Sequence, residues 1–257
     1  MKKILNPANL PWLVLTAGGI GIGLRYWLLS TGIDANNLFE TGHPADILLW
    51  VLTVVLAALV IYGCLPLIQA NKYAFNFPPA ILGAVGEGIF ALGILSVSIE
   101  ILRSVSDSLS SATVILGFLS VPALVCCAVC RWKGKQPPLF LHALVCIFFL
   151  MRLISLYRVW SPESQLQSYI FQLFANVFLL LSCYHRTAFD AACGLRRSHA
   201  LTHLAATYFC CLSLVGCQNW FLYATGIVWS ITDLCRLNPM PDWKYNLPKK
   251  DIRHEPS

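Results

Sequence analysis

Ionisable side chains interrupt some of the most apolar stretches of this 257-residue sequence. Arg25 and Arg152 each lie inside a run of hydrophobic residues, and Glu87 stands between two glycines in another. A guanidinium or carboxylate in such surroundings has to be paired, hydrated or, for the acid, protonated. Two arginines and one carboxylate could bind a small anionic solute, because a guanidinium binds carboxylate and phosphate groups through paired hydrogen bonds.

Each of these three residues also has an interpretation without function. Arg25 is close enough to the end of its apolar run for the side chain to reach the membrane surface, or to pair with an acid such as Asp34 in the following loop. Glu87 could be a neutral acid, hydrogen-bonded where its neighbouring glycines let a second helix approach. The sequence leaves both interpretations open.

The loop from Ser30 to Ala45 carries further candidates. His43 precedes Pro44, which favours an extended backbone, and its imidazole could titrate near neutral pH or bind a ligand group. With Asp34 or Glu40 it could also serve an intramembrane enzyme as an acid or base. A simple turn residue is the alternative, and no nucleophile accompanies these groups at a recognisable spacing.

His199 and His203 are four residues apart, so on a helix they share one face. Such a pair can hold a transition metal, and His185 could complete the ligand set. The sequence lacks the glutamate of the HExxH motif found in zinc proteases. Contact of the histidines with lipid headgroups is therefore favoured over metal binding, and we expect no cofactor.

The elements that position these residues follow from composition. Hydrophobic residues make up 57% of the chain and charged residues only 12%, whereas a soluble domain has about 25% charged residues. A membrane-spanning helix needs about 20 mostly apolar residues. Eight segments approach this criterion, and they predict an all-α transmembrane bundle: Leu10–Leu29, Asp46–Leu67, Ala80–Leu102, Ser111–Cys130, Leu139–Tyr157, Gln167–Tyr184, Ala200–Val215 and Trp220–Cys235.

The positions of lysine and arginine predict the orientation, because cytoplasmic loops hold the positive excess. With both termini in the cytoplasm, most basic residues fall on the cytoplasmic side: Lys2, Lys3, Lys72, Arg131, Lys133, Lys135, Arg186, Arg196, Arg197, Arg236, Lys244, Lys249, Lys250 and Arg253. The net charge of +6 is then explained by this bias and by attraction to anionic lipids. We expect the lipid bilayer, and not nucleic acid, as the charged partner.

The chain reads as one transmembrane domain, residues 1–236, followed by a polar tail, residues 237–257, that we expect to be disordered and cytoplasmic. Setting Arg25 over Arg152 aligns two segments that run in the same direction. It also brings Cys130 and Cys235 into corresponding places. This suggests a parallel repeat of four spans plus four, with halves at residues 1–135 and 136–236.

Two stretches, TGIDANNLFETGHPADILLW and RVWSPESQLQSYIFQLFANVFLLLSCYH, resemble segments of a group of uncharacterised multi-span bacterial membrane proteins. The resemblance covers about half of the chain. It implies the same architecture and a location in the bacterial inner membrane, and it implies no activity.

Three kinds of function fit these observations. The first is transport or binding of a small solute, for example an anion, by Arg25, Asp34, His43, Glu87 and Arg152. The second is a scaffold or sensor that binds another membrane protein or a second copy of itself, because Gly19 and Gly23 predict a close helix contact. The third is an intramembrane enzyme, disfavoured by the lack of a recognisable nucleophile.

Overall fold

The computed structural model describes residues 9–32, 42–67, 71–104, 107–160 and 166–237. Within these ranges all regular structure is α-helical, so the prediction of an all-α fold is confirmed. Each of the eight predicted segments coincides with one long helix, and a single turn precedes the third. The helices are α1 (Leu10–Thr31), α2 (Pro44–Cys64), α3 (Tyr73–Asn76), α4 (Ile81–Arg103), α5 (Ser108–Trp132), α6 (Leu139–Trp160), α7 (Leu166–Asp190), α8 (Arg196–Ser213) and α9 (Trp220–Cys235).

Five of these helices are long and apolar enough to cross a membrane: α1, α2, α4, α5 and the part of α6 from Leu139 to Arg158. They fit a multi-pass membrane protein. In the described part of the chain α7, α8 and α9 do not meet the same criterion. The count of eight spans therefore stays a prediction, as does the cytoplasmic location of the termini, which lie outside the described residues.

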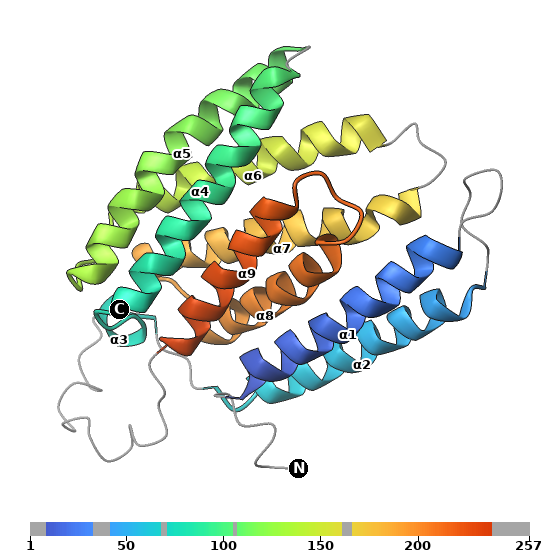
Figure 1. The fold of residues 1–257 in the computed structure, drawn as a ribbon. Coiled ribbons are helices and arrows are strands. Elements are labelled where there is room, and N and C mark those ends of the chain that lie inside the picture. Colours follow the sequence, from blue (N-terminus) through green and yellow to red (C-terminus); the bar gives the residue numbers. More distant parts are fainter. Residues whose placement is uncertain (1–8, 33–41, 68–70, 105–106, 161–165, 238–257) are drawn as a thin grey trace.

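The position of α8, beside α9, explains why α8 is the least apolar of the long helices. Both lie in the middle of the bundle, where α8 packs against α1, α2, α7 and α9, and α9 packs against α4 (Figure 1). Most of the surface of α8 is buried against protein. A helix surrounded by other helices can carry polar side chains, because these find partners in the protein and not in lipid.

The long helices alternate in direction along the chain, so their ends gather in two layers (Figure 1). One end of the bundle holds the beginnings of α1, α4, α6 and α8 and the last turns of α2, α5, α7 and α9; we call it the α8 end. The other we call the far end. Between them Phe90 stacks on Trp229, with ring centroids 4.5 Å apart, and on Phe149, at 5.8 Å. These rings belong to the largest buried apolar cluster of the described residues.

Helix α5 begins with a well-formed cap. The Asp107 carboxylate accepts a hydrogen bond from the backbone N–H of Ser110, at 2.9 Å, and lies 3.0 Å from Nη1 of Arg158 on α6. The hydrogen bonds from Ser110 stabilise the ionised carboxylate and lower the pKa of Asp107. The cap therefore joins the beginning of α5 to the last turn of α6.

The close contact between α1 and its neighbour is displaced from the predicted position. A Cβ atom on Gly18 would lie 2.8 Å from Sγ of Cys211, and one on Gly21 would lie 2.5 Å from Cδ2 of Leu212, so these two glycines face α8. A Cβ atom added at Gly19 or at Gly23 would meet no described neighbour within 4 Å. Gly19 and Gly23 therefore make no close contact with a described helix of this chain, and a contact of these glycines with another membrane protein or a second copy stays a prediction.

The internal repeat stays a prediction. In the second half α7 packs against α8, whereas α2 and α4, which would correspond to them, share no comparable contact among the described residues. Instead the α1–α2 pair packs on one flank of the central helices and the α4–α5 pair on another (Figure 1). The predicted tail lies almost entirely outside the described residues.

Candidate functional site

A buried cluster of charged and polar side chains lies inside the α8 end of the bundle. We call it the charged cluster. Its members come from α4, α5, α7, α8 and α9, and each side chain is at most 2% exposed to solvent. Burial of this many ionisable groups is costly unless they are paired, so their convergence marks the principal candidate site. The members are Glu87, Arg131, Arg186, His199, His203 and Asp233.

Ion pairs connect the helices that contribute the cluster. Nη2 of Arg186 lies 2.7 Å from Oε1 of Glu87, and Nη1 of Arg186 lies 3.6 Å from Oδ1 of Asp233. The same Oδ1 atom lies 3.3 Å from Nη2 of Arg131. Asp233 is therefore shared by two guanidiniums, one from α5 and one from α7. Two arginines and two carboxylates give the cluster no net charge when its imidazoles are neutral.

Glycines on α4 make room for these contacts. A Cβ atom at Gly83 would lie 3.0 Å from Nε of Arg131, so a larger residue there would displace the guanidinium. At Gly86 and Gly93 a Cβ atom would clash with the hydroxyls of Thr232 and Thr225 on α9. Gly86 and Gly93 are two helical turns apart and share one face. They let α4 approach α9 closely enough for Glu87 and Asp233 to share Arg186.

An aromatic side chain after α3 covers the two guanidiniums. The ring of Phe77 lies 4.5 Å from Cζ of Arg131 and 4.0 Å from Cζ of Arg186, within the range of a cation–π interaction. Tyr73 approaches Arg186 from the same turn, at 5.5 Å. Phe77 is itself only 1% exposed. The turn α3 thus closes the α8 end over the cluster.

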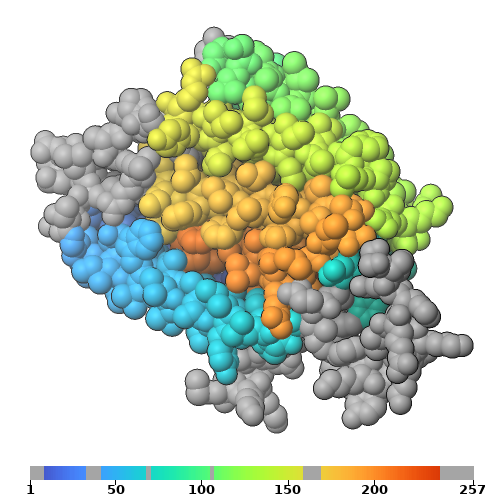
Figure 2. Space-filling view, turned by 180° about the vertical axis from the view of Figure 1, so that it is seen from behind, coloured from blue at the N-terminus to red at the C-terminus, as the bar shows by residue number. Residues whose placement is uncertain are grey.

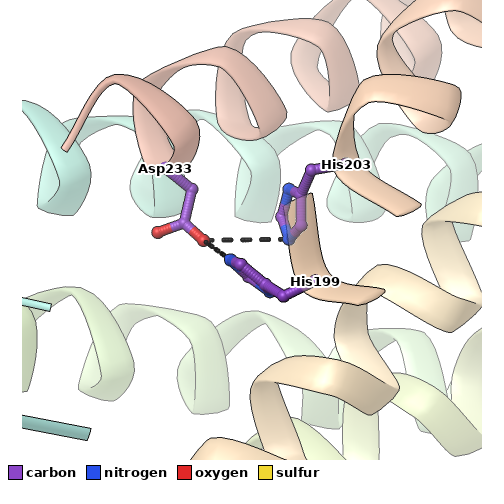
Figure 3. Close-up of side chains that lie close together, drawn as sticks. All are labelled: His199, His203 and Asp233. Atoms are coloured by element: carbon purple, nitrogen blue, oxygen red, sulfur yellow. Dashed lines mark ion pairs between the residues drawn. The ribbon is translucent and has the colours of Figure 1, made fainter. Parts of the chain in front are cut away.

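Two histidines and an aspartate within the cluster have the spacing of metal ligands (Figure 3). Oδ2 of Asp233 lies 3.0 Å from Nε2 of His199 and 3.7 Å from Nε2 of His203, and the three ligand atoms all lie within 4.8 Å of one another. Ligands of a tetrahedral zinc ion are about 3.3 Å apart. The distances therefore fit a transition metal.

The surrounding charges oppose a metal ion at this position. Two guanidiniums already occupy Oδ1 of the same carboxylate, and a divalent cation would leave a neutral cluster with two positive charges. Two unit charges 4 Å apart repel by about 4 kcal/mol at an effective dielectric constant of 20. His199, His203 and Asp233 could hold a metal by geometry, but the two guanidiniums on the same carboxylate oppose it.

A second polar group adjoins the cluster. Nδ1 of His142 on α6 lies 2.6 Å from Oδ2 of Asp190 on α7, and both side chains are buried. Sγ of Cys127 lies 3.7 Å from the same nitrogen. Cys127 and Cys130 form the only CxxC spacing in the sequence, and the structure gives Cys127 a histidine neighbour. All these groups lie at the α8 end.

The sequence-predicted arginines lie at the far end. Arg25 and Arg152 are both 3% exposed, and the charges of both reach the thiol of Cys217. Nε of Arg152 donates a hydrogen bond of 3.1 Å to Oδ1 of Asn176. Arg25 lies over the ring of Phe171, at 4.9 Å. Arg25 and Arg152 thus lie at the same end of the bundle, with different partners, in what we call the far arginine layer.

Asn176 links this layer to α9, because its Nδ2 donates to the hydroxyl of Tyr223 at 2.8 Å. Glu87 does not join the far arginine layer: its described partner is Arg186 at the α8 end. The three residues on which the sequence-based hypothesis of a solute site depends are therefore divided between two layers.

The remaining predicted site residues have local roles or lie apart. Nδ1 of His43 accepts a hydrogen bond from the backbone of Ala45, at 3.3 Å, and Nε2 lies 3.3 Å from Oγ1 of Thr31, so His43 caps α2 and ties it to α1. Asp34 lies outside the described residues. His185 is half-buried and lines a cavity with Arg197, whereas His199 and His203 face Asp233.

Sequence reasoning missed Arg131, Arg186 and Asp233. Arg131 and Arg186 were expected among the cytoplasmic basic residues, but both lie inside helices and are fully buried, and Arg196 is 2% exposed. These three arginines do not contribute to a surface positive excess. Asp233, like Glu87, is an acid inside an apolar segment of the sequence. The same criterion that identified Glu87 could therefore have identified Asp233.

No family model, curated protein or solved structure matches the chain.

Proposed function

We propose that this protein is a bacterial inner-membrane protein that binds a small anionic solute inside its helix bundle and carries it across. The observation that carries the proposal is a surplus of buried hydrogen-bond donors in the charged cluster. Nε and Nη1 of Arg131 and Nε of Arg186 are buried without a hydrogen bond among the described residues, and Nη2 of Arg131 and Nη1 of Arg186 reach Oδ1 of Asp233 only at ion-pair distances of 3.3 and 3.6 Å. Only one oxygen each of Glu87 and Asp233 is similarly unsatisfied.

A carboxylate, phosphate or sulfate group would supply the missing acceptors. Each presents several oxygens, and a guanidinium binds such groups through parallel hydrogen bonds. An unsatisfied buried polar group costs about 1–3 kcal/mol, and more when it is charged. An anion between the guanidiniums would remove several of these costs at once, which an apolar or cationic ligand would not do.

The histidines offer a way to keep the occupied site neutral. His199 and His203 lie beside Asp233, and an anion bound next to them would favour the protonated, positive form of an imidazole. A proton that binds together with a monovalent anion would leave the charge of the cluster unchanged. We therefore propose that the anion binds with a proton, and that its affinity increases as the pH falls.

The two polar layers support transport over simple binding. Asn176 and Arg186 are ten residues apart on α7, and Tyr223 and Asp233 are ten apart on α9, so each helix separates the layers by about 15 Å. The stacked rings of Phe90 and Trp229 lie between them. An anion entering from either end would meet buried arginines before reaching an apolar barrier.

Binding by the detergent-purified protein tests the proposal. Phosphate, sulfate, acetate and succinate would be titrated at pH 6 and pH 8 while the melting temperature and the heat of binding are measured. We expect at least one anion to stabilise the protein, and to do so more strongly at the lower pH. The variant Arg131→Gln should lose this stabilisation, whereas Arg236→Gln, an exposed arginine near the last turn of α9, should keep it.

A fold control separates loss of binding from loss of structure. Arg131→Lys keeps the charge but not the planar set of donors, so it should fold and bind the anion more weakly. If none of the four anions binds the native protein, or if Arg131→Gln binds as the native protein does, the proposal is wrong. Uptake of the bound anion into proteoliposomes then separates a carrier from a binding protein.

A further inference from the structure

Helices α2, α7 and α8 enclose an apolar groove on one flank of the bundle. Its volume is about 380 Å³, and its walls include Trp50 and Val60 on α2, Phe178 on α7 and Ala205 on α8. Figure 2 shows this flank, where α2, in blue to cyan, borders α7, in gold to orange. The groove therefore faces outward from the bundle. In a membrane, lipid would surround this flank.

The polar groups in the groove do not need a ligand. Oγ1 of Thr53 on α2 and the hydroxyl of Tyr208 on α8 lie 2.8 Å apart and hydrogen-bond to each other. The other lining side chains are apolar. The groove therefore offers an occupant only apolar contacts. A hydrocarbon chain, which makes only such contacts, suits it.

A second cavity, with some polar side chains in its wall, continues the groove toward the α8 end. It has a volume of about 340 Å³ and shares Ile61 and Leu201 with the apolar groove. Arg197, His185 and Ser198 also line it, and neither cavity is lined by an acidic residue. Arg197 is exposed, and its Nε donates to the backbone oxygen of Leu67 at 2.7 Å. That bond fixes the guanidinium at the mouth of the groove.

The dimensions identify the occupant. Arg197 and Tyr208 are eleven residues apart on α8, about 16 Å along the helix axis, and half of the hydrocarbon core of a bilayer is about 15 Å. A helix of that length and about 10 Å in diameter would fill about 1,200 Å³, more than the roughly 910 Å³ of empty space in the groove and its open mouth together. The space fits one acyl chain of one leaflet, with its headgroup at Arg197.

We propose that α2, α7 and α8 form a binding site for an anionic phospholipid, with one acyl chain in the apolar groove and the phosphate at Arg197. The site is separate from the charged cluster and does not depend on the proposed transport. A lipid held there would fill the space that α2 leaves over α7 and α8, and would join α2 to the rest of the bundle.

Quenching of tryptophan fluorescence by brominated lipids tests the site, because Trp50 lines the groove. The purified protein would be titrated in detergent with phosphatidylglycerol and with phosphatidylcholine that carry the same brominated chains. We expect phosphatidylglycerol to bind about fivefold more tightly, the effect of about one basic residue at an anionic lipid surface. Trp50→Phe should remove the saturable part of the quenching.

Matched variants distinguish the headgroup contact from the chain contact. Arg197→Gln should reduce the affinity for phosphatidylglycerol to that for phosphatidylcholine, whereas Arg236→Gln should leave it unchanged. Ala57 lines the groove and Ala58 does not, although both are exposed on α2. Ala57→Phe should therefore weaken the binding of both lipids, and Ala58→Phe should weaken neither.

Inorganic phosphate serves as the probe for the headgroup alone. We expect it not to compete with brominated phosphatidylglycerol, because most of the affinity comes from the acyl chain. The proposal is overturned if phosphate displaces the lipid completely, or if the two lipids bind the native protein equally. It is also overturned if the brominated lipids quench the tryptophan fluorescence of Ala57→Phe and Ala58→Phe to the same extent. Each of these results would place the anion or the chain somewhere other than this groove.

Discussion

Arg186 on α7 and Glu87 on α4 form a buried ion pair between residues 99 positions apart in the sequence. Nη2 of Arg186 lies 2.7 Å from Oε1 of Glu87, and both side chains are 1% exposed. The same guanidinium reaches Asp233 on α9 and lies against the ring of Phe77. Three helices and the turn α3 therefore meet at one arginine.

Removing one partner of this pair should destabilise the protein strongly. We expect Glu87→Gln to lower the free energy of unfolding by about 3–5 kcal/mol, because it leaves part of a buried guanidinium uncompensated. The double variant Glu87→Gln/Arg186→Met should recover part of the loss. Denaturant unfolding in detergent micelles measures both. If the free energy of unfolding lost in the double variant equals the sum of the losses in Glu87→Gln and Arg186→Met alone, the two side chains are not coupled.

Close packing of α4 on α9 gives a second prediction, with a control on the same helix. Gly93→Ala would bring a methyl group against the Thr225 hydroxyl, and we expect it to cost about 1–3 kcal/mol. Gly88 has no described neighbour within 4 Å, so Gly88→Ala should stabilise the helix by up to about 1 kcal/mol. Thermal unfolding compares the two. Equal effects would contradict the close approach of α4 and α9.

The sequence was sufficient for the helices and insufficient for the site, for a physical reason. Hydrophobic segments of about 20 residues define the elements locally, and each predicted segment is a helix in the structure. The charged cluster depends on which helices become neighbours, and apolar surfaces carry little information about that choice. Arg131 illustrates the difficulty: its position near the end of an apolar segment is typical of a surface charge, yet it is fully buried.

Glu87 and Arg152 could both be identified from sequence because a charge inside an apolar segment is rare. Their partners could not, since Arg186 and Asn176 come from α7 and are brought to them only by helix packing. The same limit explains why Glu87 was grouped with Arg25 and Arg152. Depth along a helix can be estimated from sequence, but which layer of partners a side chain joins cannot.

The charges around His199, His203 and Asp233 predict how the protein responds to metal. Because two guanidiniums contact the same aspartate, we expect less than one equivalent of zinc to remain after purification without chelator, and no change in melting temperature on addition of EDTA. Elemental analysis measures the first and thermal unfolding the second. One equivalent of metal that is lost in His203→Ala would contradict the electrostatic argument and reassign the cluster as a metal centre.

Asn176 allows a direct test of the far arginine layer. Its Oδ1 accepts a hydrogen bond from Nε of Arg152, so Asn176→Asp would place a negative charge beside the guanidinium with almost no change of shape. At 4 Å and an effective dielectric constant of 20, such a pair is stabilised by about 4 kcal/mol, and the carboxylate would compete with an anionic solute for Arg152. We expect uptake of the solute into proteoliposomes to fall at least about tenfold, which corresponds to about 1.4 kcal/mol.

Two comparisons show whether the charge of this variant causes the loss of uptake. Binding at the charged cluster, about 15 Å away along α7, should change little in the detergent-purified Asn176→Asp protein. Asn176→Gln is the control, because it keeps the layer positive while it disturbs the same hydrogen bonds. If Asn176→Asp and Asn176→Gln reduce uptake equally, the effect comes from packing, and the far arginine layer has no electrostatic part in passage of the anion.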